Sequence, residues 1–402
     1  MSLIVQKFGG TSVANTERLF NVADIITSAY KEGNRVVAVV SAQGDTTDDL
    51  IAKAAEITGS PSKREMDVLL TTGEQISMSL LAMAIEKLGF PVVSLTGWQI
   101  GLQTDANYSD ARIKKVTAER IREELDNNKI VIVAGFQGIN KYDDVTTLGR
   151  GGSDTTAVAI AASIGADLCQ IFTDVDGVYT ADPRIIKDAR KLQEITYDEM
   201  LELATLGAQV LHNRSVEMAK KYNVDLEVIS SFTRNSGTKV KEILSMEKMN
   251  VSGVARDNNV ARIALVGLED TPGIAFKVFS LMAKKKINVD IILQSIGREN
   301  KKDISFTVPL SEAENAKTVL EANKEALKFD KLSVDTGVSK VSIVGAGMAT
   351  NAGVASMMFE ALANAAVNIK MISTSEIKIS VLIDREDSEK AIKAIHSKFF
   401  NN

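Results

Sequence analysis

The feature of the sequence that most constrains the fold is a series of unbroken apolar segments, alternating with helical patterns, through roughly the first 230 residues. Arg35–Ser41 and Ile130–Phe136 are almost continuously apolar, as strands are when both faces of a parallel sheet are covered. Further strands are expected at 3–8, 91–96, 167–172 and 226–229, and helices at 16–31, 74–88, 109–126, from 196, and at 213–222. The alternation predicts one α/β domain with a mainly parallel sheet over residues 1–247.

Four polar loops follow predicted strands. They span residues 7–12, 41–47, 150–154 and 173–184. Ligands of parallel α/β sheets bind beyond the carboxyl ends of the strands, so these loops are expected to share one edge.

Two of these loops are rich in glycine, which lets the backbone approach a ligand closely. The first is Lys7-Phe8-Gly9-Gly10-Thr11-Ser12, and the second, with Arg150 beside Gly151-Gly152, opens an apolar helix that ends at Gly165. Ser153 is the expected N-cap, so that free amides, the helix dipole and Arg150 would together bind an anion. Taken alone, either loop would also suit an ordinary helix cap.

The pair of loops suits a polyphosphate, although neither ends in the Gly-Lys-Ser/Thr of a Walker A loop. Phosphoryl transfer needs positioning and charge neutralisation, which Lys7 would supply together with the backbone amides of Gly9, Gly10, Gly151 and Gly152. Asp154 has two interpretations: an acid favoured by the helix dipole, or a residue that orients Lys7 or a metal. Asp174, at a strand end, is equally a turn former or a neighbour of the metal or nucleotide.

Composition removes several other classes of function. The single cysteine, Cys169, excludes an internal disulfide and a cysteine metal site, and the two histidines, His212 and His396, give little support for a histidine metal site or a Ser-His-Asp triad. A net charge of −5, with Lys and Arg dispersed, argues against nucleic-acid and membrane partners. The chain opens directly with a strand and has no apolar run of about 20 residues, so we expect a cytoplasmic protein.

Roughly the last 150 residues contain an internal repeat. Val266-Gly267 matches Val344-Gly345, and Ile287-Asn288-Val289 matches Val367-Asn368-Ile369. Each copy reads strand, helix, strand, strand, helix, and the first copy has a final strand near 331–336. This pattern predicts two ferredoxin-like βαββαβ domains at 260–337 and 341–402. Such a pair suggests a sensor, and the alternative is a duplication that only builds an oligomer interface.

Five motifs occur in one order along the chain. They are Lys7-Phe-Gly-Gly-Thr-Ser, Val40-Ser41-Ala42, Thr72-Gly73-Glu74, Gly149-Arg-Gly-Gly-Ser-Asp-Thr-Thr-Ala and Thr173-Asp-Val-Asp-Gly-Val-Tyr-Thr-Ala-Asp-Pro-Arg184. Together they resemble the aspartate kinases of the amino-acid kinase family, and the C-terminal repeats resemble the two ACT domains of these enzymes. The resemblance implies the sandwich fold of that family, the strand 250–256 as part of the second ACT domain, and a monofunctional enzyme without a fused homoserine dehydrogenase.

The resemblance also implies the reaction: ATP phosphorylates the side-chain carboxylate of L-aspartate, with Mg²⁺ bridging the phosphates. The product, 4-phospho-L-aspartate, stands at the head of lysine, threonine and methionine biosynthesis. Lys7 would stabilise the transition state and Asp154 would organise the site; no residue is assigned as a metal ligand. The implied aspartate site comprises Ser41, Thr47, Glu74, Arg150 and Ser153. The implied ATP site comprises Lys7, Phe8, Gly9, Gly10, Gly151, Gly152, Thr173, Asp174, Tyr179, Arg184, Gln209 and Val210.

Position 209 departs from the family pattern, because glutamine stands here where the family often has lysine. If the family contact with the nucleotide is made through the backbone, little changes. If the ammonium group matters, the affinity for ATP is lower.

The ACT resemblance implies feedback inhibition by an end-product amino acid, with lysine expected, alone or together with threonine. The implied effector residues are Asp270, Gly273, Ile274, Ala275, Asn288, Val289, Asp290, Gln294, Val367, Asn368 and Ile369. For Asn288 and Asn368, shaping a turn before a strand is the alternative. Pairing of ACT domains across a two-fold axis implies a homodimer or a dimer of dimers.

Two other functions are left open by the sequence. One is a kinase of another acid, such as acetylglutamate or carbamate, against which the paired repeats and the Arg150 loop argue. The other is a catalytically inactive amino-acid sensor, against which the retention of Lys7, Glu74, Arg150 and Asp154 argues.

Overall fold

The computed structural model describes residues 2–206, 210–233, 235–242, 251–295, 297, 300–346, 348, 351 and 353–401. Contacts divide the chain into two compact units. The first comprises Met1–Tyr179 and Lys191–Glu247, and the second comprises Thr180–Arg190 and Lys248–Asn402. The segment Thr180–Arg190 lies by sequence within the expected catalytic domain, yet it packs with the second unit.

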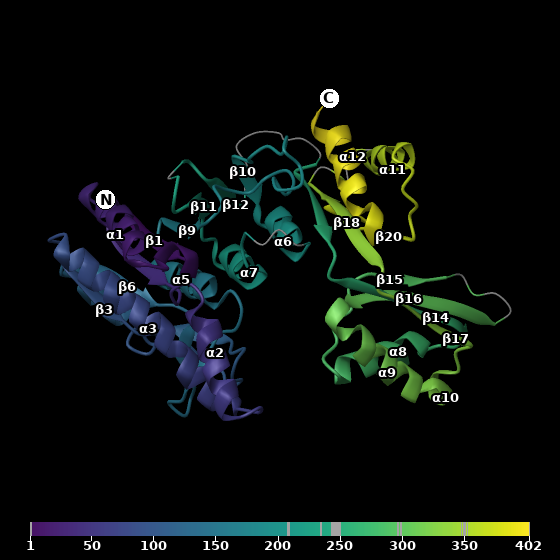
Figure 1. The fold of residues 1–402 in the computed structure, drawn as a ribbon, viewed down its shortest axis with the longest axis horizontal. Coiled ribbons are helices and arrows are strands. Elements are labelled where there is room, and N and C mark those ends of the chain that lie inside the picture. Colours follow the sequence, from purple (N-terminus) through teal and green to yellow (C-terminus); the bar gives the residue numbers. More distant parts are fainter. Residues whose placement is uncertain are drawn as a thin grey trace. The chain divides into compact units, whose positions relative to one another are not determined.

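An eight-stranded sheet forms the centre of the first unit, with the strand order β10-β12-β11-β9-β1-β2-β6-β3 (Figure 1). The pairs from β11 through β9, β1, β2 and β6 to β3 are all parallel, whereas β12 runs antiparallel to β11. The mainly parallel sheet expected from the sequence is therefore confirmed. The strands are β1 (Leu3–Phe8), β2 (Arg35–Val40), β3 (Val92–Leu95), β6 (Ile130–Ala134), β9 (Leu168–Thr173), β10 (Glu194–Thr196), β11 (Leu226–Ser230) and β12 (Thr238–Lys241).

Helices cover both faces of this sheet. α1 (Thr16–Lys31) and α3 (Lys63–Lys87) lie side by side and pack on the face that carries Phe8 and Val40 (Figure 1). α5 (Gly152–Ile164) packs against β1 and β9, and its apolar run Ala157–Ala161 is buried. Side chains alternate along a strand, so Lys7 shares the face of Val5, opposite to Phe8, and points toward α5.

A second, small sheet has the order β5-β4-β7-β8, with strands at Ile113–Val116, Leu102–Thr104, Gln137–Ile139 and Val145–Thr147. Its presence corrects one prediction: the expected helix over 109–126 is β5 followed by the shorter α4 (Glu119–Asp126). β5 pairs antiparallel with β4, and this tertiary pairing overrides the local helical pattern.

The helix expected to open with Glu74 starts eleven residues earlier, at Lys63, where the side chain of Ser62 caps α3 by accepting from the amide of Glu65. By length and composition alone, α3 is apolar enough to cross a membrane, and half of its most apolar window is buried in the protein. Leu81 and Ile85 are fully buried between α1 and the sheet. These contacts are those of a core helix. A further helix, α2 (Thr46–Ile57), starts within the expected loop 41–47.

The second unit contains two four-stranded sheets with the orders β15-β16-β14-β17 and β13-β18-β20-β19. Each has two main helices, α8 and α9 in the first and α11 and α12 in the second (Figure 1). Gly253–Asp257 (β13), which precedes the first repeat, pairs antiparallel with β18 of the second repeat. The other bounds are β14 (Val260–Glu269), α8 (Ile274–Lys284), β15 (Ile292–Gln294), β16 (Lys301–Pro309), α9 (Ala313–Ala322), α10 (Lys324–Leu327), β17 (Lys331–Asp335), β18 (Val338–Val344), α11 (Val354–Asn364), β19 (Met371–Thr374), β20 (Lys378–Asp384) and α12 (Ser388–Phe400).

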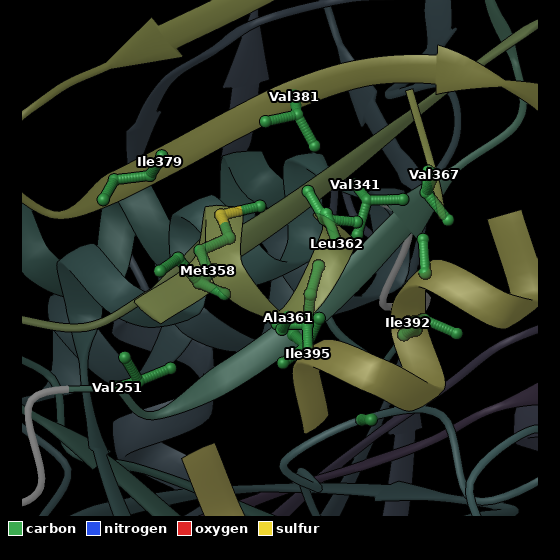
Figure 2. Packing of buried hydrophobic residues seen from close by; sticks show 14 of the residues in the cluster. Val251, Val341, Met358, Ala361, Leu362, Val367, Ile379, Val381, Ile392 and Ile395 are labelled. Atoms are coloured by element: carbon green, nitrogen blue, oxygen red, sulfur yellow. The ribbon is translucent and has the colours of Figure 1, made fainter. Parts of the chain in front are cut away.

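The core of the second repeat is formed by apolar side chains of α11, α12 and the facing strands, as Figure 2 shows around Met358 and Leu362. Ala181 and Ile186 of the segment Thr180–Arg190 belong to this same core. The segment is also held by polar contacts, because the Val254 amide donates to the Thr180 carbonyl at 2.7 Å.

Candidate active site

The candidate site lies at the edge of the main sheet where the parallel strands end. The strand registers pair Phe8 with Val40 and with Phe172, and Val40 with Ala134. The loops after β1, β2, β6 and β9 therefore leave the sheet at one edge, where parallel α/β proteins bind their ligands. The loop 150–154 does not follow a strand of the main sheet, as was expected, but follows β8 of the small sheet. It reaches the same edge where it starts α5.

An ion pair joins the two glycine loops. The Nζ atom of Lys7, near the end of β1, lies 2.7 Å from Oδ1 of Asp154 in the first turn of α5, and each side chain is 12% exposed. The pair brings together two segments that are almost 150 residues apart in the sequence. It leaves an ammonium group at the edge of the sheet, beside the start of a helix whose first amides have no acceptor within the helix.

The first glycine loop is packed tightly against the loop after β2. A Cβ atom on Gly10 would lie 2.6 Å from the carbonyl oxygen of Ala42, and the Gly44 amide donates to the Gly10 carbonyl. A Cβ atom on Gly73 of α3 would lie 2.8 Å from the Ala42 side chain. Glycine is thus needed at positions 10 and 73, where the first glycine loop and α3 both come close to the loop after β2 at Ala42. Phe8 is fully buried and stacks on Phe172, so it can meet a ligand only through its backbone.

Glu74 lies in the interior of α3 with its carboxylate turned toward Ala42. Its Oε1 accepts from the Ala42 amide at 3.1 Å, and among the described residues its Oε2 has no hydrogen-bond partner. Burial of the side chain raises the pKa of Glu74 to about 8, an effect that the backbone hydrogen bond only partly opposes. A buried carboxyl group with a free oxygen is arranged to receive a donor or a positive charge.

The second glycine loop begins α5, but its cap differs from the prediction. Gly151, with φ of 68°, is the N-cap, and the Ser153 side chain makes no cap hydrogen bond. Ser153 is instead buried inside the first turn, where a Cβ on Gly135 after β6 would lie 2.7 Å from its hydroxyl. The positive φ requires glycine or a residue that tolerates the left-handed region.

The other residues predicted to bind the substrate aspartate lie near this edge and make fewer contacts. Ser41 follows β2 directly, and Thr47 lies in the first turn of α2; both are half-buried. Arg150 is exposed, and its guanidinium has no hydrogen bond or ion pair within the described part of the chain. The structure therefore brings Lys7, Asp154 and Ser153 together and leaves Arg150 exposed. Ser41 lies on the loop after β2, and Glu74 of α3 bonds that same loop at Ala42.

The residues expected to hold the nucleotide divide into two groups. Thr173 ends β9, its hydroxyl donates to Asp174, and its carbonyl accepts from the Ser231 amide at the end of β11. Tyr179 donates to Asp176 at 2.7 Å; this bond holds the pKa of Asp176 below its usual range and raises that of Tyr179 to about 12.

Arg184, in contrast, belongs to the second unit and pairs with Asp182 at 2.8 Å, with its side chain 87% exposed. Val210 is half-buried in a turn before α7 (Asn213–Tyr222), and Gln209 lies outside the described residues.

Several residues of this region were missed by sequence reasoning. Asp67 of α3 is fully buried and accepts from Ser109 and Thr147, and Arg214 of α7 donates to the Leu148 carbonyl. Ser231 bonds the Ser12 hydroxyl at 2.8 Å. No local pattern singled these residues out, because each binds a partner far away in the sequence.

The expected effector residues of the first repeat fall at the two ends of β15. Asn288, Val289 and Asp290 precede it, and Asp290 accepts from Lys340 of β18 at 2.5 Å. Gln294 ends β15, and Asp270, which pairs with Lys302 at 2.6 Å, faces the segment after it at Gly297. Gly273, Ile274 and Ala275 open α8. In the second repeat, Val367 packs in the core (Figure 2), Asn368 is exposed and Ile369 is half-buried.

Comparison with known proteins fits this geometry. A model of the amino acid kinase family matches residues 2–230, which is more than half of the chain. The chain belongs to the amino acid kinase family. A model of the ACT domain matches residues 263–323 and 341–399, in agreement with the two repeats.

Similar proteins within this family are aspartokinases. The aspartokinase of Bacillus sp. (strain MGA3) is 50% identical over 400 residues, which cover 99% of this chain and 97% of that protein. The crystal structure of E. coli aspartokinase III in complex with aspartate and ADP (R-state) matches with a TM-score of 0.83 at 26% identity, covering 99% of this chain and 100% of that one. The same enzyme in complex with lysine and aspartate (T-state) matches with a TM-score of 0.78 at 26% identity over 99% of both chains. This amino acid kinase is therefore a phosphotransferase enzyme with two ACT domains.

Proposed function

We propose that this amino acid kinase is an aspartate kinase, which converts ATP and L-aspartate into ADP and 4-phospho-L-aspartate. The observation that carries the proposal is the Lys7–Asp154 pair, which joins the two glycine loops. The buried carboxyl group of Glu74 bonds the amide of Ala42, in the loop that packs against the first of them. Two findings support the choice of substrates. One is the aspartokinase that is 50% identical to this chain, and the other is the E. coli complex with aspartate and ADP.

The phosphate half of the site is suited to a polyphosphate. The loop at Gly9-Gly10 approaches Lys7 closely, since a Cβ on Gly9 would lie 3.5 Å from its Nζ. The first turn of α5 adds backbone amides and the positive end of the helix dipole. In the proposed reaction these groups hold the γ-phosphoryl oxygens. Lys7 neutralises the charge that develops there, and Asp154 keeps the ammonium in place.

The acceptor half holds an amino acid with two carboxylates. Arg150 would clamp one carboxylate, for which a planar guanidinium is suited, with Ser41, Thr47 and Ser153 as hydroxyl donors. Glu74 would receive the α-ammonium on its free Oε2. The arriving positive charge would lower the pKa of Glu74, and the carboxyl group would release its proton to solvent and ionise. The side-chain carboxylate of aspartate then attacks phosphorus directly, so that no enzyme nucleophile is required.

Mg²⁺ is proposed as the metal partner of ATP. The described residues contain no group of three or more His, Cys, Asp or Glu side chains that would hold an ion by themselves. Mg²⁺ commonly binds through substrate phosphates with one or two carboxylates, so the site fits this mode, with Asp154 and Asp174 as the nearby acids. The ion would neutralise phosphate charge during transfer.

Regulation is proposed to run through the ACT domains, with lysine, alone or with threonine, as the inhibitor. The E. coli relative crystallised with lysine in its T-state supports this choice. Asp270 and Asp290, at opposite ends of β15, are the proposed anionic contacts for an amino-acid effector. We further propose a homodimer or dimer of dimers, a place at the head of lysine, threonine and methionine synthesis, and a cytoplasmic location.

A steady-state assay tests the function. ADP release is measured with MgATP and a panel of acids, namely aspartate, glutamate, acetylglutamate and bicarbonate with ammonia, and then with added lysine, threonine or both. Aspartate is expected to be the preferred acceptor, and lysine is expected to lower the rate. Turnover with another acid and none with aspartate would overturn the assignment; lysine binding without any turnover would make the protein a sensor.

A further inference from the structure

We propose that Arg214, which no motif singled out, is a positioning residue for recognition of the acceptor substrate. It does not reach the reacting atoms, but it fixes the backbone of the loop Leu148–Gly152, here called the Arg150 loop. The inference rests on the proposed function, since it assigns the consequence of this contact to aspartate binding through Arg150.

Arg214 holds the entry to the Arg150 loop from one side. Its Nη1 donates to the Leu148 carbonyl at 2.5 Å, its Nη2 donates to the Ala111 carbonyl at 2.9 Å, and Nη1 lies 3.2 Å from the Asp110 carboxylate. The side chain is only 14% exposed. A guanidinium that ties two carbonyls and a carboxylate fixes the separation of the segments that carry them.

Asp67 of α3 holds the same entry one residue earlier, at Thr147. It is fully buried and accepts from three donors: the Ser109 amide, shared between its two carboxylate oxygens, the Thr147 amide at 3.0 Å and the Thr147 hydroxyl at 2.8 Å. Thr147 and Leu148 are consecutive, so the chain is held by Asp67 and then by Arg214 in two successive residues. The loop therefore starts from a fixed point.

The exit of the Arg150 loop is packed against the same turn of α7. A Cβ on Gly151 would lie 2.2 Å from the His212 ring, and His212 is the N-cap of the helix that carries Arg214. The turn His212–Arg214 thus contacts the loop at Leu148 and at Gly151. Between these points stands Arg150, which has no side-chain partner among the described residues, so its place depends on its backbone.

If the backbone of the Arg150 loop were displaced, the bidentate contact of Arg150 with a carboxylate of aspartate would be weakened but not lost. A misplacement of about 1 Å in a positioned group can cost about a hundredfold in rate, and productive geometry tolerates only about 0.5 Å. Replacing Arg214 by glutamine should raise the KM for aspartate by roughly tenfold or more. The KM for ATP should rise less than the KM for aspartate. Gly151 and Gly152 of the loop also serve the phosphates, but Lys7 and the first glycine loop are not held by Arg214.

Three variants test the proposal. Arg214→Gln removes the guanidinium group. Arg214→Lys keeps the charge with a single donor group and serves if the glutamine variant does not fold. Arg112→Gln is the matched control. Arg112 also lies near Asp110, at 3.7 Å, but its side chain is 58% exposed and it has no hydrogen bond to the loop. Both Arg214 variants should raise the aspartate KM, and the control should leave it unchanged.

A second readout does not depend on any substrate. Trypsin cleaves after arginine, and Arg150 is exposed, so the rate of cleavage at Arg150–Gly151, followed by mass spectrometry and normalised to cleavage after the exposed Lys141, reports the loop directly. Faster cleavage in both Arg214 variants with a selective rise of the aspartate KM supports the proposal. Unchanged cleavage, or equal rises of the KM for both substrates, overturns it. Faster cleavage in a protein that does not use aspartate would reject the proposed function and keep the assignment of Arg214 to the loop.

Discussion

The Glu74→Gln substitution should make the protein more stable, and increasingly so as the pH rises. Glu74 is 3% exposed, and its burial raises its pKa from an ordinary 4.5 to about 8. Between these two values the folded chain binds a proton that the unfolded chain has released. Stability is therefore lost as the pH rises from about 4.5 to about 8.

The magnitude follows from the same two values. One pKa unit corresponds to about 1.36 kcal/mol, so the full rise amounts to roughly 5 kcal/mol and the part lost by pH 7 to roughly 3 kcal/mol. Glutamine has no proton to lose, although its NH2 group places two donors where the protonated acid has one. At about 2–4 °C per kcal/mol for a domain of this size, the variant should melt roughly 6–12 °C higher at neutral pH.

The assay is thermal unfolding of both proteins, followed by circular dichroism, at about pH 5.5, 7 and 8.5. The gap in melting temperature should widen with pH. Glu124 provides a matched control, because it is equally buried but pairs with Lys129 at 2.8 Å and with Arg120, and its pKa is lowered chiefly by the bond to Lys129. Glu124→Gln should destabilise at neutral pH and lose that effect in acid. A Glu74→Gln variant that is less stable than wild type at about pH 8.5 would refute the reasoning.

Three further outcomes are expected. Lys7→Ala should lower kcat by roughly a hundredfold to a thousandfold with the fold retained, whereas Lys114→Ala, on exposed β5, should leave kcat unchanged; equal kcat in the two variants removes Lys7 from the mechanism. Gly10→Ala should lower the free energy of unfolding by about 1–3 kcal/mol, because its Cβ would meet the Ala42 carbonyl at 2.6 Å. Gly59→Ala has nothing within 4 Å of its Cβ and should leave that free energy unchanged; thermal unfolding of both variants measures the difference. Asp290→Asn should raise the lysine concentration needed for half inhibition, and an unchanged inhibition curve would place the effector elsewhere.

The fold could be predicted where one local pattern decides the structure. β2 reads Arg-Val-Val-Ala-Val-Val and is buried on both faces. The helix expected from 196 is α6 (Tyr197–Thr205), which opens with a capping box formed by Thr196 and Glu199. The prediction was wrong at 109–126, because β5 has two exposed lysines and exists through its pairing with β4. Short strands of this kind depend on a partner that the local sequence does not name.

The candidate site shows the same division. Its glycine loops could be found because close approach demands glycine at Gly10 and Gly151. Asp67 and Arg214 could not be found, since they bind backbone groups 80 and 66 residues away at Thr147 and Leu148. Backbone acceptors and donors carry no side-chain signature, so only the folded chain reveals which loops such residues fix.

The segment Thr180–Arg190 makes the chain pass between its two units three times rather than once. A fragment cut at residue 248 would keep β13 and α12 but lose the Thr180 hydroxyl that bonds His396 at 2.9 Å, together with Ala181 and Ile186. Such a fragment should melt at a lower temperature than one to which a peptide of residues 180–190 is restored. Any division of this gene into two separately expressed units must therefore decide which of them keeps these eleven residues.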